Sequence, residues 1–148
     1  MAPDLYETDF YAWTQAQASF LRQGKINQLD VVNLVEEIES LGRQQTQELK
    51  NRLGVLIGHL LKWQYQASNR SKSWKYTIQE QRLQILDLLD QNPSLKSYQD
   101  EAVAKGYQLG LLLVGRETPL DPKTLPRQCP FTLEQLLDDQ FPQDLDVL

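Results

Sequence analysis

The sequence predicts an all-α fold, a single-domain helical bundle of about five main helices plus a short C-terminal helix. Apolar residues recur at spacings of three and four along most of the chain, which is the period of an amphipathic helix, and the alternating pattern of a β-strand is nearly absent. The 148 residues include 41% hydrophobic and 24% charged residues, an ordinary composition for a globular protein. A chain of this length buries roughly 70% of the surface that its unfolded form exposes. We therefore expect one domain over residues 1–148, ending in a loose acidic tail at 140–148.

Cap residues, glycines and prolines mark the ends of the expected helices. Gly42 is expected to end the second helix or to kink it, because an unbroken run from 30 to 67 would be unusually long for a globular domain. The third helix, at about 43–67, is expected to be the central one. The expected helices lie at about 9–23, 30–41, 43–67, after Ser71 or Ser73, at about 93–117 and at about 132–138. The apolar face of the second helix consists of Val31, Leu34, Val35, Ile38 and Leu41.

Two glycines in the central helix predict close packing. Gly54 and Gly58 are four residues apart and fall on the side nearly opposite to the apolar stripe of this helix. A glycine inside a helix costs about 1 kcal/mol in helix propensity, so a structural reason for the pair is expected. We predict that a second element packs closely against this side, and that Gly106 of the 93–117 helix also faces inward.

The net charge of −5 is unevenly distributed along the chain. Residues 1–42 carry two basic and seven acidic residues, residues 43–82 carry eight and two, and residues 83–148 carry five and eleven. The basic middle can form a cationic surface for a polyanion, or it can pair with the acidic outer helices inside one fold. We favour the second interpretation, because the acidic flanks cancel most of the long-range field.

Cysteine usage and hydropathy indicate the compartment. The lone Cys129 cannot form an internal disulfide, and one cysteine with one histidine cannot make an all-Cys/His zinc site. The N-terminus lacks the basic flank and apolar run of a secretory signal, and the longest apolar stretch, 109–115, is far short of the roughly 20 residues needed to cross a bilayer. We expect a cytoplasmic protein without a membrane partner.

Sequence motifs of phosphate-binding loops, metalloproteases, serine hydrolases and dinucleotide-binding folds are absent, so no catalytic residue and no cofactor are predicted.

His59 and nearby carboxylates form the first candidate site. His59 lies at the edge of the apolar stripe of the central helix, beside Trp63, where a histidine is most often a packing residue with hydrogen-bonded ring nitrogens. It can ligate a metal or shuttle a proton only if carboxylates from another helix converge on it. Because Glu37 and Glu39 fall on opposite edges of their helix and Glu36 points outward, at most one of them can meet His59. We favour a solvated face with a rim salt bridge to the central helix.

The segment 62–76 is the second candidate, a polyanion-binding surface. Cations and aromatics alternate there, which suits phosphate contact and base stacking. Trp63 and Trp74 fall on the apolar stripes of their helices, where a tryptophan is usually core, so the tyrosines and cations are left for the surface. The candidate residues are Lys62, Tyr65, Arg70, Lys72, Lys75 and Tyr76.

Five segments together resemble a known family. FYAWT, LVEEIESLG, HLLKWQYQ, SWKYTIQEQR and CPFTLEQLLD occur in the order typical of the domain-of-unknown-function 29 family, which is abundant in cyanobacteria and found in other bacteria. The resemblance runs from about Tyr6 to Phe141. It implies an all-α bacterial cytoplasmic protein, and it implies no activity and no catalytic residue.

The function that we expect is that of a non-enzymatic interaction module, which binds a protein partner or forms a homo-oligomer. This expectation follows from the segregation of acid and base and from the lack of a convergent catalytic set. Two alternatives stay open. The first is binding of single-stranded nucleic acid or another polyanion through 62–76, and the second is a metal-dependent activity that uses His59 with Glu37 or Glu39.

Overall fold

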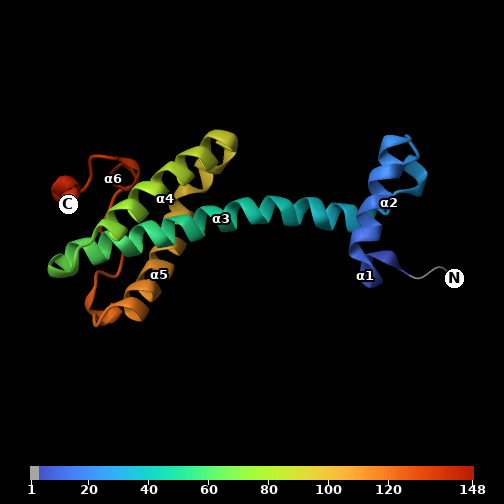
Figure 1. Ribbon diagram of the computed structural model, residues 1–148. Helices are drawn as coiled ribbons and strands as arrows, with labels where there is room; N and C mark the ends of the chain where they lie inside the picture. The colour runs from blue at the N-terminus through green and yellow to red at the C-terminus, as the bar shows by residue number, and fades with distance from the viewer. Residues whose placement is uncertain (1–3) are drawn as a thin grey trace. The chain divides into compact units, whose positions relative to one another are not determined.

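The structure, a computed structural model, describes residues 4–148 and is all-α over that range, as predicted (Figure 1). The α-helices of the described chain are α1 (Leu5–Thr8), α2 (Phe10–Arg22), α3 (Val31–Tyr65), α4 (Lys72–Gln91), α5 (Gln99–Glu117) and α6 (Leu133–Leu137). Short 3-10 helices lie at η1 (Ile26–Gln28), η2 (Ala67–Asn69), η3 (Pro93–Tyr98), η4 (Pro122–Thr124) and η5 (Leu145–Val147). The chain divides into two compact units, residues 1–44 and 45–148, and each is described by itself. The single-domain organisation stays a prediction.

Helix α3 is continuous over 35 residues, so separate helices at 30–41 and 43–67 are not formed, and of the two alternatives for Gly42 the first, that it ends a helix, is wrong. A Cβ on Gly42 would meet nothing within 4 Å, and the residues on both sides of it favour a helix. Ion pairs of Arg43 with Glu36 (3.0 Å) and Glu39 (3.9 Å) stabilise the same turns of the helix. These pairs and the absence of proline offset the cost of one glycine. Among residues 4–148, none of the helices combines the length and apolar character that crossing a bilayer requires.

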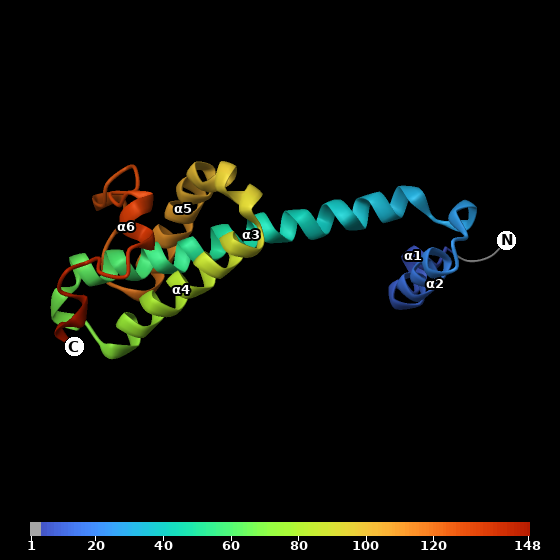
Figure 2. The same ribbon diagram turned by 90° about the horizontal axis from the view of Figure 1, so that it is seen from above.

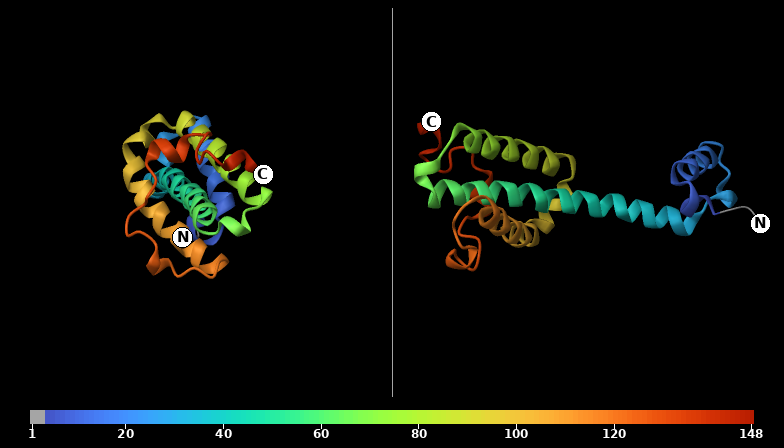
Figure 3. Two further views of the ribbon diagram at one scale, coloured as in Figure 1. Left: turned by 90° about the vertical axis from the view of Figure 1, so that its left-hand side faces the viewer. Right: turned by 60° about the horizontal axis from the view of Figure 1, so that its bottom comes forward.

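In the second unit, the 45–65 part of α3 lies between α4 and α5 (Figures 2 and 3). The glycine side of α3 is packed against α5. A Cβ on Gly54 would stand 2.8 Å from the Leu109 Cβ, and one on Gly110 would stand 3.0 Å from the Gly58 amide nitrogen. Gly106 is buried in the same seam, where an added Cβ would be 2.9 Å from the Leu53 Cβ. The predicted close packing against Gly54 and Gly58 is therefore confirmed.

The core of the second unit is formed by the leucine stripe of α3 together with α4, α5, α6 and the C-terminal residues. Ser71, one of the two serines expected to precede α4, caps this helix, and Thr132 and Gln135 form a capping box on α6, which begins close to the expected position. The large side chains that are completely buried are Leu49, Leu53, Leu56, Ile57, Leu60, Leu61, Trp63, Ile78, Ile85, Val114 and Leu136.

The expected loose tail at 140–148 is instead packed against the second unit. Leu145 is only 2% exposed. The Asp144 carboxylate accepts hydrogen bonds from the Trp63 indole (3.0 Å) and the Arg70 guanidinium (2.6 Å), and Asp146 lies 3.4 Å from the Lys75 ammonium group. The expectation of a loose tail was wrong because the acidic residues of this segment meet cations of the basic middle of the chain.

The first unit consists of α1, α2, η1 and the beginning of α3. Three aromatic side chains of this unit form a cluster, in which the Trp13 ring centroid lies 4.9 Å from that of Tyr6 and 5.5 Å from that of Phe10. The Trp13 indole donates to the Asp30 carboxylate (3.0 Å), and the Asp30 amide donates to the Gln17 side chain (2.8 Å). These contacts attach α2 to the N-terminal end of α3 through polar groups as much as through apolar ones.

Candidate functional site

His59 lies half-buried on α3 of the second unit. Its Nδ1 lies 2.8 Å from the Val55 carbonyl oxygen, one turn earlier in α3, and the ring is partly buried. Burial lowers the pKa of His59 below its ordinary value, while the hydrogen bond to the Val55 carbonyl acts in the opposite direction. The ring is therefore neutral at neutral pH, with Nδ1 as the donor.

The other residues of the first candidate site have separate partners. Trp63 is buried, and the Arg70 guanidinium carbon lies over its indole ring, 4.6 Å from the ring centre. Glu37 accepts a hydrogen bond from the Tyr6 hydroxyl (2.5 Å), and Glu39 is an exposed partner of Arg43. The two glutamates belong to the first unit, and His59 belongs to the second. Across residues 4–148, no group of three or more histidine, cysteine, aspartate or glutamate side chains is arranged to hold a metal ion.

Three cations of the 62–76 candidate surface are paired with carboxylates. Lys62 is buried, and its ammonium group lies 3.2 Å from Glu117 and 4.6 Å from the centre of the Trp74 ring. Arg70 and Lys75 pair with the two C-terminal aspartates described above. These ion pairs support the interpretation that the basic middle pairs with the acidic 83–148 region. Lys72, Tyr65 and Tyr76 are exposed.

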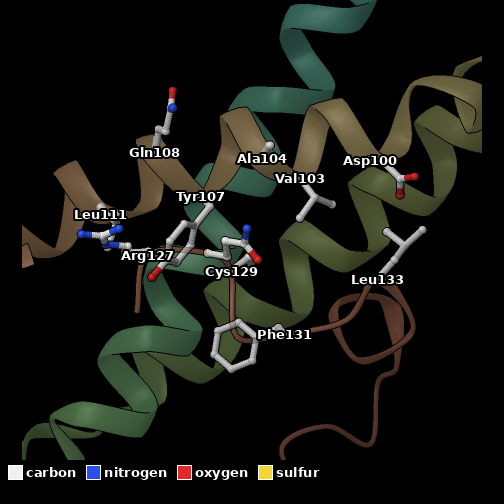
Figure 4. Close-up of a pocket in the computed structure, with 11 residues that line it drawn as sticks. Asp100, Val103, Ala104, Tyr107, Gln108, Leu111, Arg127, Cys129, Phe131 and Leu133 are labelled. Carbon is white, nitrogen blue, oxygen red and sulfur yellow. The ribbon is translucent and has the colours of Figure 1, made fainter. Parts of the chain in front are cut away.

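A pocket of about 480 Å³ opens between α5 and the segment 118–132, which contains Cys129 and which we call the strap (Figure 4). The Tyr107 hydroxyl donates to the Pro126 carbonyl oxygen (2.5 Å), which fixes the strap against α5. Burial raises the pKa of the Cys129 thiol, so the thiol is protonated at neutral pH and is a poor nucleophile. The charged side chains that line the pocket are Asp100 and Arg127. The pocket can accommodate a ligand, but the Cys129 thiol beside it is not activated as a nucleophile.

Sequence reasoning missed Arg82, a buried cation on α4 of the second unit. Arg82 is 3% exposed, and its guanidinium donates to the carbonyl oxygens of Leu136 (2.8 Å) and Gln135 (3.1 Å) at the end of α6. Burial lowers its pKa, and the Asp138 and Asp139 carboxylates raise it. The signal was present in the sequence, because Arg82 occupies a core position of α4 at helical spacing between Ile78 and Ile85.

Exposed apolar side chains are concentrated in the first unit. Of the large apolar side chains at 4–44, Trp13 is the buried one, whereas ten are between 38% and 79% exposed. Those ten are Leu5, Phe10, Tyr11, Leu21, Ile26, Val31, Val32, Val35, Ile38 and Leu41.

Four of these side chains form a row on α3, which we call the α3 stripe: Val31, Val35, Ile38 and Leu41. At 100° per residue they fall within about 120° of one another on the helix. Each is between 47% and 65% exposed. The half-buried residues of this part of α3 are Asn33, Leu34, Glu37 and Ser40, and Glu37 accepts the Tyr6 hydrogen bond. Leu34 lies between Leu41 and Ile38 around the helix, so this side of the helix is half-buried at Leu34 and exposed at the four apolar side chains of the stripe.

These observations define an all-α protein in which a well-packed second unit is joined to a small first unit with an open apolar stripe. The chain belongs to the family described as domain of unknown function DUF29, whose model matches residues 5–142. No curated protein and no solved structure matched the sequence.

Proposed function

We propose that this protein is a protein-interaction module and that the α3 stripe is its docking surface. The observation that supports the proposal most strongly is the exposure of four branched apolar side chains in a row on one side of a helix. Isolated apolar residues are normal on protein surfaces, whereas contiguous ones are typical of interaction sites.

The small core of the first unit is a second argument. A folded segment of about 40 residues usually needs a disulfide, a metal or a partner, because it buries too little surface by itself. The buried side chains of this unit are Trp13 and Gln17, and the second of them is polar. Burying one Val, Leu or Ile side chain contributes about 1.5–3 kcal/mol, so a partner on the α3 stripe would add stability that the unit lacks.

Site-specific photo-crosslinking in the cells that naturally produce the protein tests this proposal. A photoreactive amino acid is placed at Ile38 in the stripe or, as a control, at Val32, which is 79% exposed and lies outside it. We expect covalent adducts of a defined mass from position 38 and none from position 32. No adduct from position 38, or the same adducts from both positions, would contradict an interaction through the stripe.

The two alternative functions stay predictions with their own tests. A polyanion would contact Lys72, Tyr65 and Tyr76, and a fluorescence titration that lacks salt-sensitive binding excludes it. A metal-dependent activity would need His59, and elemental analysis of the purified protein, compared with the His59→Ala variant, detects a bound metal if there is one.

A further inference from the structure

We infer that the partner on the α3 stripe is a second copy of this chain, so that the stripes of two copies pack against each other. This inference rests on the proposed function and names the partner. Three features of the first unit support it, namely the charges around the stripe, a glycine within it and the amount of apolar surface.

The side of α3 that carries the stripe is free of charged residues, so two copies can meet there without burying like charges. The charged side chains of this part of the helix are on other sides. Glu36 and Arg43 lie opposite the stripe and are 3.0 Å apart, and Glu39 also pairs with Arg43. A strongly basic or acidic partner would gain nothing from an uncharged stripe, whereas an identical stripe matches it in chemistry.

Gly42 lies on the same side of the helix as the stripe. No close contact within the described chain requires a glycine at this position. The glycines at 54, 58, 106 and 110 each sit where another helix comes within 2.8–3.0 Å of an added Cβ. At Gly42 nothing lies within 4 Å of an added Cβ, although a glycine there costs about 1 kcal/mol relative to alanine. A helix from a second copy, approaching as closely as α5 approaches α3, would occupy this open space.

A contact centred on the stripe reaches the size of a stable dimer interface when it also takes in the other exposed side chains of the first unit. At roughly 60–100 Å² for each side chain, the four of the stripe present on the order of 240–400 Å², and the nine exposed side chains other than the control Val32 present on the order of 540–900 Å². The largest apolar patch on a typical monomer is about 300–600 Å², and each partner of a standard interface buries about 800 Å². Contact between identical surfaces closes around a two-fold axis, which yields a dimer and not an open chain of copies.

Sedimentation equilibrium of the purified full-length protein tests the inference. We compare the wild type with Ile38→Asp, which places a carboxylate in the stripe, and with Val32→Asp, which places the same group among the charged residues. We expect a dimeric wild type, a dissociation constant raised about 100-fold or more by Ile38→Asp, and a change within about threefold for Val32→Asp. Circular dichroism checks helical content. If Ile38→Asp loses helix, Ile38→Gln and Val32→Gln, which keep helix propensity, make the same comparison.

Two results would overturn the inference. The first is a wild type that stays monomeric up to millimolar concentration. The second is a dimer that Ile38→Asp or Ile38→Gln does not weaken, because such a dimer uses another surface. The crosslinking experiment separates this inference from the proposed function. Adducts from position 38 with a mass other than twice that of the chain contradict the second copy but keep the interaction module, and a complete lack of adducts contradicts both.

Discussion

Gly58 and Gly110 lie so close together that a methyl group has no room between their helices. A Cβ on Gly110 would stand 3.0 Å from the Gly58 nitrogen, and a Cβ on Gly58 would stand 3.3 Å from the Gly110 oxygen. Both of these obstacles are backbone atoms, which cannot rotate away, whereas the atom nearest to a Cβ on Gly58, Leu113 Cδ2 at 2.9 Å, is the end of a flexible side chain. The two glycines therefore set the distance between α3 and α5.

Replacing either glycine with alanine is expected to force the two helices apart. Overpacking of this kind costs about 1–3 kcal/mol in the free energy of unfolding, and the better helix propensity of alanine recovers only part of it. Urea unfolding of Gly58→Ala and Gly110→Ala, followed by circular dichroism, measures this loss.

Gly42→Ala is the matched control for this pair, because it makes the same change within a helix at a position with open space. The comparison is made in the Ile38→Asp background, which keeps copies of the chain apart. Gly42→Ala should not lower the free energy of unfolding. Equal destabilisation by all three substitutions would show that the glycine seam does not set the helix spacing.

Arg82 is expected to hold the end of α6 against α4. In Arg82→Met, the carbonyl groups of Gln135 and Leu136 lose the hydrogen bonds that Arg82 donates, which costs about 1–3 kcal/mol of unfolding free energy. Arg82→Lys should recover only part of this loss, since an ammonium group cannot reproduce the planar guanidinium fork. Thermal unfolding measures the effect, with the exposed Arg127→Met as the control. A loss no larger than that of Arg127→Met would contradict this role.

The hydrogen bond from Trp63 holds the pKa of the Asp144 carboxyl below its ordinary value, and Arg70 adds to this effect. A lowered pKa in the folded state means that the carboxylate stabilises the fold above the pKa of the unfolded chain, which is about 4 for aspartate. This stability is lost as the pH falls through the lower pKa of the folded state. The unfolding free energy of the wild type should therefore fall more steeply below about pH 4 than that of Asp144→Asn. Parallel pH profiles would show that the Asp144 pKa is not shifted.

The hydrogen bond to Glu37 raises the pKa of Tyr6 to about 12. Because the neutral phenol is favoured in the folded state, its contribution to stability is complete below the ordinary tyrosine pKa of about 10 and is lost as the pH rises toward about 12. Burial also raises the pKa of Tyr107, so the ultraviolet titration is compared with that of Glu37→Gln, in which the pKa of Tyr6 should fall. An unchanged titration in Glu37→Gln would mean that the bond between Tyr6 and Glu37 does not form.

Much of the fold could be predicted because its signals are local. The Ser71 cap and the Thr132 capping box depend on residues within one turn, and the spacing of Gly54 and Gly58 indicates a close neighbour whatever that neighbour is. The pairing of the basic middle with the acidic C-terminal region could be predicted from charge alone.

The features that could not be predicted depend on distant residues. The C-terminal segment is ordered by Asp144, whose partners Trp63 and Arg70 are 81 and 74 residues away in the chain. The sequence also shows that Val31, Val35 and Ile38 share one side of a helix, but it does not show whether another element of the chain covers that side. In the candidate site, Glu37 serves as a hydrogen-bond acceptor for Tyr6, a residue in another helix 31 positions earlier.

Amide hydrogen exchange tests most directly whether a second copy covers the α3 stripe. It is measured for residues 31–41 at protein concentrations below and above the dissociation constant, with the buried 53–61 part of the same helix as the internal reference. We predict that exchange at 31–41 slows as the concentration rises, while exchange at 53–61 stays constant. Exchange at 31–41 that is the same at every concentration would contradict the pairing of two α3 stripes.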